Sequence, residues 1–112
     1  MNTYIKLQQP RYKERSGFST TAYFRDNSGA STVPTTVHYR VDDINSKTNI
    51  TGWTAISAAA SVTVTITPTE NKMVNNGNNE RRQLTVAADK GLSTESRDTL
   101  EWKVENIRGF DE

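Results

Sequence analysis

The sequence predicts an all-β fold, a single antiparallel sandwich of about seven short strands. Residues 61–67 alternate apolar and polar side chains without exception, which is the two-residue period of a strand with one buried face. Comparable runs recur roughly every ten residues with turn-forming residues between them, a spacing typical of sandwiches and barrels. No stretch carries the apolar stripe of an amphipathic helix.

The predicted strands share a composition. β-Branched and aromatic residues recur at alternate positions, and Gly, Pro, Asp or Asn lies between the runs. The polar stretch 43–52 and the Asn-rich stretch 69–79 are predicted loops, and their length suits the crossovers between sheets in a Greek key. The predicted strands are residues 3–8, 17–25, 35–42, 53–56, 61–67, 81–88 and 99–105.

The same alternation assigns the hydrophobic core, because one face of each strand is apolar and the other is polar or charged. Trp53 opens a short strand and is expected to cover one end of this core. The residues expected to be buried are Val37, Tyr39, Val41, Val62, Val64, Ile66, Leu84, Val86, Leu100, Trp102 and Val104.

Length and composition restrict the functional classes. The chain has 112 residues, enough for one domain, with a net charge of +1, which argues against a general electrostatic grip on nucleic acid or an anionic membrane. It has no cysteine, so disulfides and thiolate metal sites are excluded.

No apolar run is long enough to span a membrane, and the N-terminus lacks a signal-peptide core. These features predict a single domain that is made and assembled in a cytoplasm.

Side chains capable of chemistry are scattered along the chain. His38 is the only histidine and lies on a predicted outward face, so it is expected to be solvated or paired. Residues 42–45 lack the glycine and terminal glutamate of a calcium loop. Glu101 and Glu105 lie about 13 Å apart along one strand, farther than glycoside cleavage requires. We therefore expect no enzyme activity, no cofactor and no bound metal.

Two small charged clusters have simple structural interpretations. Residues 11–15 combine basic side chains with Tyr12 and are predicted to form an exposed turn or sheet edge. Residues 80–82 are predicted to be a solvated entrance to the strand that follows. A contact of 11–15 with nucleic acid is the less favoured interpretation, because the chain is nearly neutral.

Several motifs resemble known families. Val37-His38-Tyr39-Arg40-Val41, then Trp53, then the alternating strand, then residues 84–93 look like the later strands of a fibronectin type III or immunoglobulin-like sandwich. The chain departs from the animal fibronectin pattern, since residues 17–25 lack a central tryptophan and residues 81–88 lack the tyrosine of the tyrosine corner. The phrase Tyr39-Arg40-Val41-Asp42-Asp43 and the closing Trp102-Lys103-Val104-Glu105-Asn106 are more similar to small immunoglobulin-like proteins of tailed bacteriophage particles.

The resemblance implies a fold and a function. The expected fold is a seven-stranded antiparallel Greek-key sandwich spanning residues 1–112, and the expected function is that of a virion structural protein on the capsid surface, at the neck or in the tail. Its partners would be other virion proteins and copies of itself, as a homo-oligomer or in many copies, with no nucleic acid and no membrane.

The N-terminus is the expected docking arm, and one other function stays open. Residues 1–16 are polar, and their few apolar side chains are candidates for docking, namely Tyr4, Ile5, Leu7 and Tyr12. The alternative function is a carbohydrate- or host-cell-surface-binding module in which an exposed Tyr12, Tyr23 or Trp53 stacks on the ligand.

Overall fold

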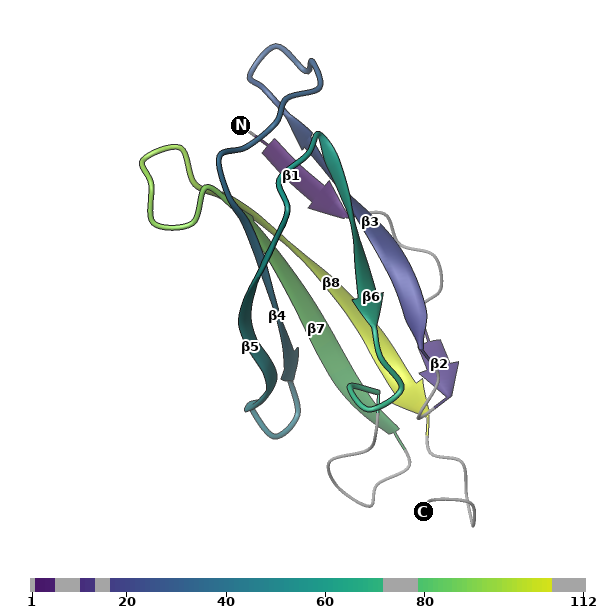
Figure 1. The fold of residues 1–112 in the computed structure, drawn as a ribbon. Coiled ribbons are helices and arrows are strands. Elements are labelled where there is room, and N and C mark those ends of the chain that lie inside the picture. Colours follow the sequence, from purple (N-terminus) through teal and green to yellow (C-terminus); the bar gives the residue numbers. More distant parts are fainter. Residues whose placement is uncertain (1, 6–10, 14–16, 72–78, 106–112) are drawn as a thin grey trace.

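The computed structural model describes residues 2–5, 11–13, 17–71 and 79–105. These residues form two β-sheets and no helix (Figure 1), so the all-β prediction is confirmed. In chain order the strands are β1 (Asn2–Ile5), β2 (Arg11–Lys13), β3 (Phe18–Arg25), β4 (Val37–Asp43), β5 (Thr48–Ile56), β6 (Ser61–Ile66), β7 (Asn79–Ala88) and β8 (Ser96–Glu105).

The two sheets differ in size. One has three strands in the order β1-β3-β6, and the other has five in the order β2-β8-β7-β4-β5. Neighbouring strands are antiparallel, except that β2 runs parallel to β8. The chain passes from one sheet to the other after β1, β2, β3, β5 and β6, whereas β4–β5 and β7–β8 are hairpins within the larger sheet.

The core lies between the sheets and follows the alternation of the sequence. In β6, Val62, Val64 and Ile66 are buried, whereas Thr63 and Thr65 are exposed. Inward residues of β3, β4, β7 and β8 join the same cluster, including Phe24 and Ala22. All the residues predicted to be buried are confirmed except Tyr39, which is half-buried at the margin of the core.

Ile66→Ala tests this assignment. Ile66 is wholly buried, so its truncation leaves a cavity and is expected to lower the free energy of unfolding by about 2–5 kcal/mol. Thr65→Ala is the matched control, because Thr65 is the exposed neighbour on the same strand, and it should cost less than about 1 kcal/mol. Urea denaturation of both variants gives the comparison, and equal losses would show that the inward face is wrongly assigned.

Two regions differ from the prediction. The stretch 43–52 is not one loop, because a turn at residues 44–47 leads straight into β5, which begins at Thr48. The polar β-branched threonines and the half-buried Ile50 of β5 suit an edge strand that has little apolar surface to bury. The charged stretch 11–15, predicted as an exposed turn or sheet edge, contains β2, which is an edge strand of the larger sheet; the described residues therefore hold eight strands and not seven, and β2 is parallel to its neighbour.

The N-terminal residues take part in both sheets. β1 pairs with β3, and Ile5 packs against the core. β1 also makes two hydrogen bonds to β8: the Ile5 backbone amide donates to Asp98 Oδ2 at 2.9 Å, and the Thr3 hydroxyl donates to the Ser96 backbone carbonyl at 3.4 Å. β1 is thus a sheet strand fastened to β8, in addition to any docking role it has.

Candidate functional site

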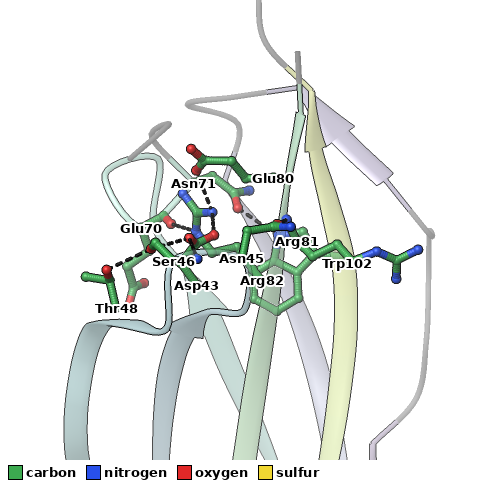
Figure 2. A network of polar contacts seen from close by, with 10 residues as sticks. All are labelled: Asp43, Asn45, Ser46, Thr48, Glu70, Asn71, Glu80, Arg81, Arg82 and Trp102. Carbon is green, nitrogen blue, oxygen red and sulfur yellow. Dashed lines mark hydrogen bonds and ion pairs between the residues drawn. The ribbon is translucent and has the colours of Figure 1, made fainter. Parts of the chain in front are cut away.

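A buried group of charged side chains closes one end of the core. Glu80 and Arg82 continue the inward face of β7 beyond Leu84, and both are buried. The Arg82 guanidinium donates through one nitrogen to Asp43 Oδ1 at 2.6 Å and to Glu80 Oε1 at 2.9 Å (Figure 2). Asp43 comes from the end of β4, so this ion triad connects β4 to β7. The sequence-based prediction of a solvated strand entrance is wrong for Arg82 and Glu80.

The carboxylate of Asp43 also shapes the turn between β4 and β5. Its second oxygen accepts hydrogen bonds from the Ser46 amide at 3.0 Å and the Ser46 hydroxyl at 2.5 Å. In the same turn, Asn45 Oδ1 accepts from the Arg81 amide at 2.8 Å, which fastens the turn to β7. One aspartate therefore serves both the buried ion triad and the exposed turn.

The turn after β6 joins the same network. Glu70 accepts hydrogen bonds from the Thr67 amide at 2.8 Å and from the Thr51 hydroxyl of β5. The next residue, Asn71, is wholly buried, and its Oδ1 accepts from Trp102 Nε1 at 2.8 Å (Figure 2). Side chains from two strands of the larger sheet, β5 and β8, therefore hold this turn against the end of the core.

This network is a structural device. Asp43, Glu70 and Glu80 are buried, and each accepts hydrogen bonds from neighbouring groups, so a substrate meets no free carboxylate there. Within the described ranges, no group of three or more His, Cys, Asp or Glu side chains could hold a metal ion. Buried, satisfied polar groups of this kind fix one arrangement of the surrounding loops.

The outer face of the larger sheet carries the second feature, a tryptophan among three cations. The sequence predicted that Trp53 covers one end of the core. This prediction is wrong, because Trp53 lies half-buried on the outer face of the larger sheet. The charged groups of Arg40, Lys90 and Arg97 lie 5.5, 5.1 and 5.2 Å from the centre of its ring, within cation–π range. We call these four residues the Trp53 cluster.

Strand order explains how the Trp53 cluster assembles. Trp53 is on β5, Arg40 on β4 and Arg97 on β8, so the contact between Trp53 and Arg97 passes over both β4 and β7. Ala87, which pairs with Arg97, lies on this outer face of β7, yet it is wholly buried. Its burial shows that neighbouring side chains on this face cover it.

Carboxylates hold two of the cations in place. Asp42 accepts two hydrogen bonds from Arg40, at 2.8 and 2.9 Å, and Glu95 accepts one from Arg97. The Gly91 amide and Arg97 together lower the pKa of Glu95 below its usual range, so Glu95 is ionised at neutral pH. Two of the three cations of the Trp53 cluster, Arg40 and Arg97, therefore have carboxylate partners as well as the indole ring.

His38 lies next to this region on the outer face of β4. It pairs with Ala55 of β5 and Ala87 of β7, and its side chain is half-buried, not fully solvated. Its Nδ1 is buried without a hydrogen-bond partner in the described part of the chain.

The tyrosines considered for ligand stacking do not join Trp53. Tyr23 is on β3, where Ala22 and Phe24 point inward, so Tyr23 faces outward from the smaller sheet. Trp53 faces outward from the larger sheet, on the opposite side of the sandwich. Of the candidate docking residues, Tyr4 lies in β1, Tyr12 in β2, Ile5 at the core margin, and Leu7 outside the described residues.

Asp89 fastens the opposite end of the sandwich and gives a pH prediction. Its carboxylate accepts hydrogen bonds from the Thr94 hydroxyl at 2.7 Å and the Thr35 amide at 2.6 Å, and these bonds lower its pKa below the usual range. A carboxylate whose pKa is lowered by folding stabilises the protein above its unfolded pKa, and that stabilisation is lost as the pH falls through the folded value. The contribution of Asp89 should therefore disappear in acid.

Asp89→Asn is the appropriate variant, because Asp89 has a φ of 54° and Asn tolerates that left-handed conformation. At neutral pH the variant should melt at a lower temperature than the parent, and the gap should narrow as the pH is lowered below about 4. Thr99→Ala, at an exposed position without a titratable group, should show no such pH-dependent gap. A gap of constant size from neutral to acid pH would contradict this role of the Asp89 charge.

Comparison with known proteins identified no related protein. No family model matches the chain, and no curated protein or solved structure matches it. Among the described residues, no helix has the length and apolar character needed to cross a membrane.

Proposed function

We propose that this chain is a non-enzymatic structural protein of a tailed bacteriophage particle, which binds another virion protein on the capsid surface or at the neck. The proposal includes an immunoglobulin-like Greek-key fold in which β1 and β3–β8 are the seven principal strands and β2 is an addition. Hairpins at β4–β5 and β7–β8, with crossings between the sheets after β3, β5 and β6, support this fold. The motifs around residues 37–43 and 102–106 support the phage assignment.

The main observation in support of a protein-binding role is the Trp53 cluster. Trp and Arg are the residues that most often dominate the binding energy of protein interfaces. Here a tryptophan and two arginines lie together on an outer sheet face, and salt bridges to Asp42 and Glu95 already orient the arginines. Side chains ordered before binding lose less entropy when a partner arrives. A modest single contact is enough in a particle, because many copies on one shell bind with high avidity.

Reconstitution tests this function. Particles assembled without the protein are mixed with the purified chain and sedimented, and the bound fraction is measured. The parent should co-sediment in a fixed ratio to the shell protein, whereas Trp53→Ala should bind at least about tenfold more weakly. Thr99→Ala, on the exposed outer face of β8, is the matched control and should bind like the parent. Thermal melts establish that both variants are folded.

The outcomes separate the parts of the proposal. A parent chain that never co-sediments contradicts the virion function. Full binding by Trp53→Ala leaves the virion function standing and removes the Trp53 cluster as the binding surface.

The carbohydrate alternative is less well supported. Sugar stacking needs an open aromatic face, and the Trp53 ring has three cations against it. Tyr23, which was also considered for stacking, lies on the other outer face and does not extend the same platform. Binding of the parent on a glycan array, lost in Trp53→Ala and kept in Thr99→Ala, would favour the alternative.

A further inference from the structure

The four sheet edges in the described chain differ in how they are protected. The larger sheet ends at β2 and β5, and the smaller sheet ends at β1 and β6. An open edge presents unpaired amides and carbonyls that another strand can bind, so proteins usually protect their edges with bulges, charges, short strands or covering groups.

Three edges have such protection. The pairing of β5 with β4 is interrupted by two register shifts, which bend this edge strand away from regular geometry. β2 has three residues, two of them basic. β1 lies against β8, and the Ile5 amide already donates a hydrogen bond to the Asp98 side chain at 2.9 Å.

Within the part of the chain that the structure describes, the β6 edge has none of these protections. β6 pairs with β3 in an unbroken register over six residues, from Ser61 to Ile66, and none of the six is charged or a proline. Among the described strands, none pairs with its other side (Figure 1). Its outward side chains, Ser61, Thr63 and Thr65, are small and exposed. Its β-branched residues favour an extended chain.

We propose that the β6 edge pairs with the β6 edge of a second copy of this chain, in an antiparallel arrangement about a two-fold axis. Such a pair would join the two smaller sheets into one continuous sheet with the order β1-β3-β6-β6-β3-β1. The inference does not depend on the proposed virion function, because it uses only the geometry and composition of this edge.

Self-pairing is favoured over a charged partner by the composition of the surface. β6 has no charge, so two copies meet without like charges opposite each other. The outward residues of β3 that pair with β6, namely Ser19, Thr21 and Tyr23, are also uncharged, whereas the outer face of the larger sheet carries charges of both signs. Cross-strand hydroxyl pairs stabilise a sheet, and one already forms within the chain between Ser19 and Thr65, 3.1 Å apart.

The symmetry limits the assembly to two copies. A two-fold contact uses the same surface on both partners and therefore closes on itself. Each copy offers one unprotected edge among its described strands, so the pair has no further free edge of this kind on which to grow. The contact is about 20 Å long at strand rise, which is small for an interface and predicts a weak, concentration-dependent dimer.

Analytical ultracentrifugation across a wide concentration series tests the proposal. The parent should change from monomer to dimer between low micromolar and near-millimolar concentration. Thr63→Lys places a charge at the middle of the pairing and should weaken the dimer at least about tenfold, because the two lysines would approach each other. Thr99→Lys is the matched control, an exposed threonine on β8, and should dimerise like the parent.

Charge rescue makes the result specific. An equal mixture of Thr63→Lys and Thr63→Glu should form a heterodimer, although neither variant forms a homodimer. Amide exchange gives a measurement that needs no mutation: β6 amides should exchange more slowly as the concentration of the parent rises. A parent that stays monomeric throughout, a Thr99→Lys defect equal to that of Thr63→Lys, or a mixture that stays monomeric would overturn the proposal.

Discussion

Replacing Arg82 with methionine is expected to lower the free energy of unfolding by about 3–5 kcal/mol, because it leaves buried carboxylates without their cation. Arg82 and Asp43 are wholly buried, and Glu80 is 3% exposed. The guanidinium lies 2.6 Å from one carboxylate and 2.9 Å from the other. Methionine fills a similar volume but donates no hydrogen bond, so both carboxylates lose a partner in a place that water reaches poorly.

Arg81→Met is the matched control for this prediction. Arg81 is the preceding residue on β7, but its side chain is 58% exposed and lies 3.6 Å from Glu101. Exposed pairs contribute less than about 1 kcal/mol, so this variant should unfold close to the parent in urea. Similar losses for Arg81→Met and Arg82→Met would contradict a buried ion triad at this end of the core.

Neutralising the partners separates burial from charge. In an Arg82→Met background, adding Asp43→Asn and Glu80→Gln should recover part of the lost stability, because neutral amides are less costly to bury than unpaired carboxylates. If the penalty came only from lost packing around the Arg82 side chain, these additions would destabilise the protein further.

The alternation of apolar and polar residues predicted most of the strands and most of the core. A strand that buries one face has an apolar side chain at every second position, and this pattern is visible in the sequence of the strand alone. Val62, Val64 and Ile66 show this most clearly. The same pattern extends through Glu80 and Arg82 on the inward face of β7. Alternation alone did not predict that Glu80 and Arg82 are buried, because charged side chains are usually exposed to solvent. Arg82 can be buried only because β4 supplies Asp43 as its partner.

The Trp53 cluster could not be predicted in this way. Its members, Arg40, Trp53, Lys90 and Arg97, meet only through the lateral order β5-β4-β7-β8. That order depends on which strands become neighbours, and alternation within a single strand contains no information about it. For the same reason the unprotected β6 edge becomes visible only once the position of every other strand is known.

The N-terminal arm illustrates a related difficulty. Its polar composition suggested a weakly held segment, but strand pairing does not require an apolar side chain at every position. Because β1 pairs with β3 and its Ile5 packs on the core, deleting residues 1–10 would remove a sheet strand together with any docking contact. Point substitutions are therefore the better test of docking by this segment.

Among the apolar positions, substitution of Trp102 is expected to lower the free energy of unfolding most. Two substitutions, Trp102→Ala and Trp102→Phe, separate the contribution of its ring packing from that of its hydrogen bond. Trp102 is 2% exposed, and its ring lies 5.2 Å from that of Phe18 in an edge-to-face arrangement. Trp102→Ala removes this packing and leaves a large cavity, which should cost about 3–5 kcal/mol. Trp102→Phe keeps much of the packing but removes the Nε1 donor to Asn71, which should cost about 1–3 kcal/mol.

The second tryptophan provides the control for these measurements. Trp53 lies on the outer face of the larger sheet, where truncation opens no internal cavity, so Trp53→Ala should cost less than Trp102→Phe. Urea unfolding followed by circular dichroism is the suitable measurement, since fluorescence would change with the loss of either indole. If Trp53→Ala destabilised the protein as much as Trp102→Ala, the two faces of the larger sheet would be reversed and Trp53 could not serve as an exposed binding residue.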